Sequence, residues 1–200
     1  MCVGGIQQDL TLENGVTINH CQEYKYLGLK ITQDGTLDKN IQERCTQGRK
    51  AIALLNTILW YKSIFKENKH NIYNSIVKSI ITYSSEVWPL KEKSENMLRT
   101  TEMDFWRRAA GVSRRDKIRN TRILEIMDVK HTIIDDIKTK QLRWFGHVQR
   151  MEDERLLKQV LMWAPKGRWK RGRPRKSWME GIHREIEERG LNEDMCYDRE

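Results

Sequence analysis

The stretch DKNIQERCTQGRKAIALLNTILW, residues 38–60, decides the fold class of this chain. Its apolar or small residues recur at intervals of 4, 3, 4, 3 and 4, through Ile41, Cys45, Gly48, Ile52, Leu55 and Leu59. Intervals that alternate between three and four place side chains on one face of an α-helix. The spacing therefore predicts one amphipathic helix over 38–60, with Asp38 as its capping residue.

Two further helical patterns follow this stretch. The spacing predicts a helix over 67–87, and its apolar face is marked by Ile72, Ile76, Ile80 and Tyr83. A third helix is predicted over 94–110, where Gly111 supplies the residue that commonly ends a helix. These long helical patterns indicate a mainly α chain.

The carboxyl-terminal half carries shorter helical patterns. Less regular helices are expected over 121–127, 131–151 and 153–163. The last predicted helix covers 178–189, where Ser177 and Glu180 form a capping-box pattern and Gly190 follows the end. The stretch APKGRWKRGRPRKS between the last two helices is rich in Gly, Pro and Arg, which predicts an exposed loop.

Residues 1–35 show a different pattern, typical of strands. Asn14-Gly15 and Asp34-Gly35 are turn signals. Between them the segment 24–31 alternates aromatic or apolar residues with polar or small ones. We therefore expect two or three short strands before the first helix.

Composition limits the class of protein. The chain has 200 residues, 37 Lys+Arg against 28 Asp+Glu, and a net charge of +9. That length suggests one domain or slightly more. Its apolar runs fall short of the roughly 20 residues that a bilayer span needs, and the first ten residues lack the pattern of a signal peptide. We expect no membrane partner and an intracellular location, nuclear or cytoplasmic.

The positive charge is concentrated in two segments. Residues 107–122 contain seven Arg or Lys and one acid, and residues 164–178 contain seven and no acid. Their sum, +6 and +7, exceeds the net charge of the whole chain. Local basicity of this kind is typical of a surface that binds a polyanion.

The second basic segment contains Arg171-Gly172-Arg173-Pro174, which looks like the core of an AT-hook, a short element that binds the DNA minor groove. Arginines along a narrow A·T groove meet concentrated negative potential, and Gly172 leaves room for close approach. A loop that contacts phosphates without sequence preference explains the same residues. Both interpretations stay open.

The sequence shows no pattern for an active site or a metal centre. Four cysteines form no CxxC pair, and five histidines form no HxH or HxxxH pair. The adjacent acids Asp135 and Asp136 would diverge by about 100° on a helix, so they cannot chelate one ion alone. Nucleophile and phosphate-loop motifs are also missing. We expect this chain to be no enzyme and to hold no cofactor.

Four phrases in series resemble one family. They are YKYLG at 24–28, ITYSSEVW at 81–88, RWFGHVQRM at 143–151 and GRPRKSW at 172–178. In this order they resemble the carboxyl-terminal portion of the endonuclease and reverse transcriptase polyproteins of non-LTR, LINE-type retrotransposons. The likeness extends from about residue 8 to residue 190.

The resemblance implies a division of the chain into five parts. Residues 1–35 would be a β-hairpin remnant of the polymerase palm, and 36–111 a thumb-like helical bundle. A helical extension, a basic loop and a final helix with an acidic tail would follow over 112–163, 164–177 and 178–200. In the complete parent polymerase, we expect this region to contact the palm and fingers.

The resemblance also implies site residues. Tyr26, Leu27 and Gly28 would match the side of the primer grip. The residues expected to match a carboxyl-terminal nucleic-acid contact are Arg168, Lys170, Arg171, Gly172, Arg173, Pro174, Arg175 and Lys176. Local basicity, independently of the resemblance, adds Arg107, Arg108, Arg114 and Arg115 as expected contacts. The family's polymerase carboxylates lie in a Tyr/Phe-x-Asp-Asp motif that is missing from these 200 residues. We therefore expect a catalytically incomplete fragment, and Mg²⁺ only in the complete parent polymerase.

Three hypotheses follow from the sequence. In the first, the chain is a thumb and carboxyl-terminal region that contacts the phosphates of DNA, RNA or an RNA/DNA hybrid. In the second, it is a helical protein-interaction module with no nucleic-acid role. In the third, it is a domesticated AT-hook-like DNA-binding protein. Salt dependence separates the first from the second, and preference for A·T duplex separates the third from the first.

Overall fold

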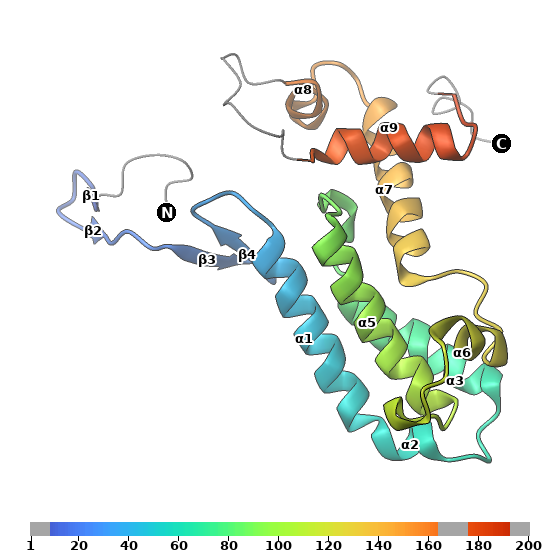
Figure 1. Cartoon of the computed structure of the whole chain (residues 1–200). Coiled ribbons are helices and arrows are strands. Elements are labelled where there is room, and N and C mark those ends of the chain that lie inside the picture. Colours follow the sequence, from blue (N-terminus) through green and yellow to red (C-terminus); the bar gives the residue numbers. More distant parts are fainter. Residues whose placement is uncertain (1–8, 164–175, 193–200) are drawn as a thin grey trace. The chain divides into compact units, whose positions relative to one another are not determined.

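The computed structural model describes residues 9–163 and 176–192. It is mainly α-helical with β-hairpin structure near the amino terminus, which confirms the predicted fold class (Figure 1). The chain divides into two compact units. Unit 1 contains residues 1–84 and 93–130, and unit 2 contains residues 85–92 and 131–200. The finer division implied by the resemblance stays a prediction.

The amino-terminal segment forms two antiparallel hairpins. Strands β1 (Leu10–Thr11) and β2 (Thr17–Ile18) pair across the predicted Asn14-Gly15 turn. Strands β3 (Glu23–Tyr26) and β4 (Leu29–Thr32) pair next. The turn signal at Asp34-Gly35 is confirmed by a hydrogen bond of 3.0 Å from the Gly35 N–H to the Thr32 carbonyl.

The alternating segment 24–31 is not one continuous strand. Leu27 and Gly28 both adopt positive φ, 46° and 78°, and reverse the chain in its middle. Two consecutive residues with positive φ make the tight turn whose twist matches that of paired strands. The described residues therefore contain four short strands instead of two or three.

The stretch 38–60, predicted to be one helix, is helical with one interruption. Helix α1 (Asp38–Leu54) and helix α2 (Asn56–Trp60) are separated by Leu55. The predicted stripe packs inward, with Ile41, Cys45, Ile52 and Leu59 fully buried. Leu37, rather than Asp38, occupies the capping position of α1, so the predicted cap is wrong.

The next helical segment buries a different face from the predicted one. It comprises α3 (Lys66–Ile72), a π-helical turn η1 (Tyr73–Lys78) and α4 (Ser79–Ile81). The buried row is Lys69, Tyr73, Val77 and Ile81, whereas Ile76 and Tyr83 are 40% and 46% exposed. Both rows carry apolar groups, but Lys69 and Tyr73 find buried hydrogen-bond partners, so their row can pack inward.

Helix α5 (Glu92–Ala109) supplies the aromatic core of unit 1. The rings of Tyr73, Phe105 and Trp106 lie with centroids 4.6 to 5.0 Å apart. The Tyr73 hydroxyl donates to the buried carboxylate of Glu102 at 2.9 Å. The Nε2 atom of His70 lies 2.6 Å from the carbonyl of Met127, just after α6 (Asn120–Ile126). These contacts fix the end of α5 from which the first basic segment leaves.

Unit 2 is built around α7 (Ile133–Gln149). Gln141 donates its side-chain amide to the carbonyls of Ser85 and Trp88, at 3.1 and 2.8 Å. The indole N–H of Trp178, the first residue of α9 (Trp178–Glu188), donates to the Glu86 carbonyl at 2.8 Å. The short 3-10 turn η2 (Ser85–Val87) is thus held by both helices.

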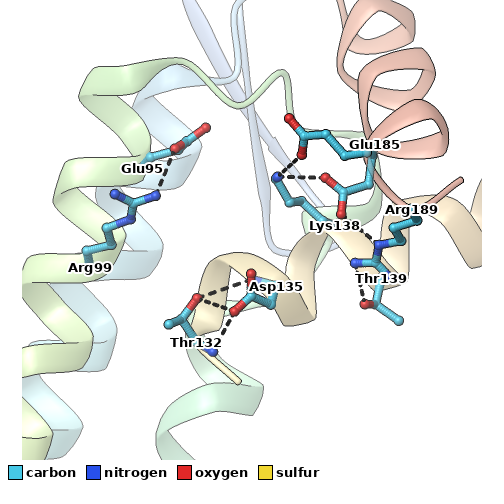
Figure 2. A network of polar contacts seen from close by, with 9 residues as sticks. Glu95, Arg99, Thr132, Asp135, Lys138, Thr139, Glu185 and Arg189 are labelled. Atoms are coloured by element: carbon cyan, nitrogen blue, oxygen red, sulfur yellow. Dashed lines mark hydrogen bonds and ion pairs between the residues drawn. The ribbon is translucent and has the colours of Figure 1, made fainter. Parts of the chain in front are cut away.

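Polar contacts join α7 to α9 inside unit 2, as Figure 2 shows. Lys138 pairs with the buried Glu185 at 2.6 Å, and the same carboxylate accepts from Arg189 at 2.7 Å. Burial alone would raise the pKa of Glu185, but the hydrogen bonds and charges of Lys138 and Arg189 lower it overall. The carboxylate therefore stays ionised in the core of unit 2.

The last predicted cap is confirmed in part. Ser177 Oγ accepts from the Glu180 N–H at 3.1 Å. The Glu180 carboxylate pairs with Arg184 at 3.4 Å, and no reciprocal bond to Ser177 is formed. Gly190 ends the helix as predicted, with φ of 62°.

Helix α8 (Leu156–Met162) differs from the other described α-helices because none of its residues is buried. Large apolar side chains on it and next to it, Leu156, Leu157, Val160, Met162 and Trp163, are 50% to 73% exposed. No helix in residues 9–163 and 176–192 is long and apolar enough to cross a membrane.

Candidate nucleic-acid interface

A short turn between α5 and α6 carries most of the first basic segment. Residues Arg114–Asp116 form a 3-10 turn, η3. The Ser113 hydroxyl accepts from the Arg115 N–H at 3.2 Å, and the Asp116 carboxylate accepts from the Ser113 N–H at 2.6 Å. This reciprocal arrangement is a capping box, and it uses the one acid of the segment to fix the backbone.

We call residues 113–119 the arginine turn. Its four cationic side chains are exposed: Arg114, Arg115, Lys117 and Arg119. Among the described residues, none of them makes a side-chain hydrogen bond or an ion pair. The next cation, Arg122, is paired with Glu125 at 2.9 Å. The turn thus presents four charges that the protein itself does not use.

Arg107 holds the far end of the arginine turn. Its guanidinium donates to the Ile118 carbonyl at 2.9 Å and to the Asn120 side-chain oxygen at 2.7 Å. The residue is half-buried on α5. Since both bonds end at residues where the turn meets α6, Arg107 holds the carboxyl-terminal end of the turn against α5.

Arg108 also bonds to the protein. It pairs with Asp104, one helical turn earlier, at 3.2 Å. A second guanidinium nitrogen donates to the side-chain oxygen of Asn56, which also accepts from the indole N–H of Trp60. Arg108 therefore ties the end of α5 to helix α2.

A Gly111 with φ of 68° turns the chain between these two groups of cations. The Val112 N–H donates to the Arg107 carbonyl at 2.9 Å, and the Gly111 N–H to the Arg108 carbonyl at 3.0 Å. This pair of bonds is the Schellman motif, which needs a left-handed residue at the position of Gly111. The predicted helix stop is confirmed.

The three residues expected at a primer grip form the tip of the second hairpin. The carbonyl of Leu27 accepts from the Tyr83 hydroxyl at 2.7 Å, and that of Gly28 accepts from Arg44. The Arg44 guanidinium also lies 4.3 Å from the centre of the Tyr83 ring. The tip is thus fastened to Arg44 of α1 and to Tyr83 within unit 1, whereas the side chains of Tyr26 and Leu27 are 56% and 71% exposed.

The phrases that carry the family resemblance meet in space within each unit. In unit 1, Tyr83 of the second phrase bonds to Leu27 of the first. In unit 2, Trp178 of the fourth phrase bonds to Glu86 of the second and lies 6.4 Å, ring to ring, from Phe145 of the third. These contacts join distant parts of the chain inside each unit, while the side chain of Leu27 stays exposed.

The second basic segment is placed only at its end. Arg168, Lys170, Arg171, Gly172, Arg173, Pro174 and Arg175 lie outside the described residues. Lys176 is described, and it lies half-buried two residues before α9. Of the sequence-predicted contacts, the described part therefore brings together Arg107, Arg108, Arg114 and Arg115 at the end of α5 and the turn beyond it.

Arg44 was not predicted from the sequence, and Lys117 and Arg119 were predicted only as members of the basic segment 107–122. Lys117 and Arg119 lie in the basic segment, so the charge count contained their signal. Arg44 lies on α1, far along the chain from the hairpin tip that it binds, and no local pattern marks that contact.

The described residues offer no metal centre. No group of three or more His, Cys, Asp or Glu side chains in residues 9–163 and 176–192 is placed to hold an ion. Asp135, one member of the adjacent acid pair, accepts from the N–H and hydroxyl of Thr132 and caps α7 (Figure 2). The donor set for Mg²⁺ is therefore not assembled in this part of the chain.

Comparison with known proteins found a distant relative. No family model matches the chain, and no solved structure matches it. The chain is 28% identical over 176 residues to a protein of Caenorhabditis elegans described as an uncharacterized transposon-derived protein. The match covers 84% of this chain and 62% of that relative, so the chain spans about three fifths of the relative's length. This likeness fits a transposon origin.

Proposed function

We propose that the chain is the thumb and carboxyl-terminal region of a non-LTR retrotransposon reverse transcriptase, and that it binds the backbone of nucleic acid. The four phrases in series and the transposon-derived relative support the origin. The helical body behind an anchored hairpin tip fits the thumb and primer-grip side that the resemblance implies. Duplex DNA and an RNA/DNA hybrid are the proposed ligands.

The arginine turn carries the proposal. Four exposed cations stand on a backbone that a capping box and Arg107 hold in place. The acid within the turn, Asp116, already accepts a hydrogen bond from the Ser113 N–H. Cations without protein partners break no ion pair or hydrogen bond of the protein when they bind phosphates. Their binding releases the counterions that condense on nucleic acid. Pre-ordering the turn also reduces the conformational entropy lost on binding.

In this proposal the 200 residues do not polymerise by themselves. They contain no Tyr/Phe-x-Asp-Asp motif, and the adjacent acids Asp135 and Asp136 lie at the first turn of a helix. The contribution of the chain is to hold a template and primer whose chemistry takes place on polymerase carboxylates elsewhere.

The proposal is tested by fluorescence anisotropy with the full chain, using duplex DNA, an RNA/DNA hybrid and single-stranded RNA at several salt concentrations. Four phosphate contacts predict a log-log slope of affinity against salt of about −3.6. A variant with Arg171, Arg173 and Arg175 changed to Ala measures the share of the second basic segment. Absence of binding at low salt, or a slope near zero, would contradict the proposal.

A protein-interaction role is the second candidate, and helix α8 favours it. Its exposed apolar residues form the kind of surface that marks a protein partner. Such a contact would respond little to salt, in contrast to phosphate binding. A double variant with Leu156→Ser and Val160→Ser should then lose binding of that protein partner and bind nucleic acid as the wild type does.

A further inference from the structure

A second surface of unit 1 combines exposed aromatic rings with lysines. It lies in the sequence WYKSIFK, residues 60–66, which connects α2 to α3. Trp60, Tyr61 and Phe65 are 40%, 61% and 75% exposed, and Lys62 and Lys66, which follow Tyr61 and Phe65, are exposed as well. We call these five residues, together with Lys69, the aromatic–lysine cluster.

The lysines of the cluster line one pocket. It has a volume of about 230 Å³, and Lys62, Lys66 and Lys69 contribute to its wall. The other lining residues are Trp60, Ile64, Ala109, Ala110, Gly111, Ile126 and Met127, so no acid faces the pocket. The pocket therefore gathers positive charge in a half-open, partly apolar hollow, which favours an anion.

Lys69 gives the pocket a fixed floor. It is only 5% exposed, and its ammonium donates to the carbonyls of Leu59 and Ala109 at 2.9 and 2.7 Å. No carboxylate among the described residues pairs with it. Burial removes this ammonium from water, which costs solvation free energy and lowers the pKa of Lys69. A bound anion would relieve this cost.

One of the three exposed rings is held in place by a hydrogen bond. Trp60 is held by a hydrogen bond of 3.1 Å from its indole N–H to Asn56, whose side-chain oxygen Arg108 also binds. A fixed, exposed ring loses little freedom when a base stacks on it. Figure 1 shows α2, α3 and α6 gathered at the end of unit 1 where α5 ends.

We propose that the aromatic–lysine cluster binds an unpaired stretch of nucleic acid, with bases stacked on its rings and a phosphate in the lysine-lined pocket. Rings and cations without acids match the alternating bases and phosphates of a single strand. A duplex hides the faces of its bases in the stack, so it cannot use the rings. The cluster would thus hold a frayed or displaced strand beside a duplex bound at the arginine turn.

The experiment uses the full chain and labelled single strands of about 12 nucleotides, within the site sizes of single-strand binders. One probe is oligo-dT, one has the same backbone with abasic sites, and one is a duplex of equal length. The test variant carries Tyr61→Ala and Phe65→Ala. Leu54→Ala serves as the matched control, because Leu54 is an apolar residue of unit 1 that is 88% exposed.

The test variant is expected to bind oligo-dT about 10- to 100-fold more weakly, to bind the duplex within about twofold of the wild type, and to lose the preference for oligo-dT over the abasic strand. Tyr61→Phe with Phe65→Tyr should restore that preference. Lys66→Ala should reduce the salt slope by about one.

Three outcomes would overturn the inference: unchanged oligo-dT binding in the test variant, equal losses on single strand and duplex, or a wild-type dimer that dissociates when the rings are removed. The inference does not require the arginine turn to bind duplex. A variant of the turn should keep its preference for oligo-dT over the abasic strand, so failure of the one site is distinguishable from failure of the other.

Discussion

Two groups of arginines stand within nine residues of each other, and the protein uses them in opposite ways. Arg107 and Arg108, at the end of α5, are half-buried and donate to oxygens of the protein itself. Arg114 and Arg115, in the turn beyond Gly111, are exposed and have no side-chain partner among the described residues. Equal charges close together in sequence therefore differ in their availability to a ligand.

The difference teaches that a basic segment contains both a binding surface and its support. Guanidinium groups that bond to carbonyls position the backbone, because they make several directed bonds at once. Those that face solvent contribute charge to any polyanion that approaches. If this division is real, variants of the two groups should change different measured quantities.

The largest expected effect comes from reversing the charge of the exposed pair. Arg114→Glu with Arg115→Glu should weaken duplex binding by about 100- to 1,000-fold, because two phosphate contacts become two repulsions. The free energy of unfolding should change by no more than about 0.5 kcal/mol. Anisotropy and urea denaturation measure the two quantities.

The control for this charge reversal is Lys93→Glu with Arg99→Glu, which changes the net charge equally at exposed positions of α5. An equal loss of affinity in the control would mean that only the overall charge of the protein matters. It would contradict the assignment of Arg114 and Arg115 as phosphate contacts.

The second prediction concerns the supporting group. Arg107→Ala removes the bonds to Ile118 and Asn120, so the free energy of unfolding should fall by about 2 kcal/mol. Arg107→Lys keeps the charge but loses the paired geometry, so it should recover only part of this stability. Denaturation of both variants checks the point. Wild-type stability in Arg107→Ala, combined with weak nucleic-acid binding, would instead make Arg107 a direct phosphate contact.

The glycine between the two groups gives a smaller effect. Gly111→Ala should lower the free energy of unfolding by about 1 kcal/mol, because its φ of 68° strains any side chain. Gly181→Ala, in α9, should raise it by about 0.5 kcal/mol. Nothing lies within 4 Å of an added Cβ at either site, so the pair isolates the backbone effect. Two changes of equal sign in thermal unfolding would show that φ does not decide the outcome.

Thr132 and Asp135 form a capping box at the start of α7, which extends the comparison to pH. Burial alone would raise the pKa of Asp135, but hydrogen bonds from Thr132 and the charges of Lys138 and His131 lower it overall. The ionised carboxylate therefore stabilises unit 2 above about pH 4, and this contribution is lost as the pH falls through the lowered pKa.

Asp135→Asn should cost up to about 1 kcal/mol at neutral pH and flatten the loss of stability below pH 4, with duplex affinity unchanged. The dependence of urea midpoints on pH measures this. A weaker affinity for duplex at neutral pH in Asp135→Asn would show that the cap of α7 matters for binding as well as for stability.

How much of this could be predicted depended on whether the cause was local. The stripe from Ile41 to Leu59 and the stops at Gly111 and Gly190 follow from spacing and from backbone preference, and the structure confirms them. The turn at Leu27-Gly28 was also local, but alternation across it resembled a single strand. Leu27 is an uncommon residue at positive φ, so its sequence gave little sign of a turn.

Other features depend on partners distant in sequence. Tyr83 was expected in a core row, but its hydroxyl binds the hairpin tip, 56 residues earlier in the chain. For the candidate site, the count of charges located the basic segment but could not divide it. Whether an arginine faces solvent depends on carbonyls such as that of Ile118, which only the folded turn brings within reach.

The central claim is that the exposed cations of the arginine turn, rather than basicity in general, bind the nucleic-acid backbone. The most direct measurement compares salt slopes for duplex binding in two variants of equal net charge. One changes Arg114, Arg115, Lys117 and Arg119 to Ala, and the other changes Arg49, Lys50, Lys93 and Arg99, which are also exposed. The account predicts that the slope of log affinity against log salt becomes less negative by about 3 to 4 in the first variant and by less than about 1 in the second. Equal reductions in both variants would contradict it.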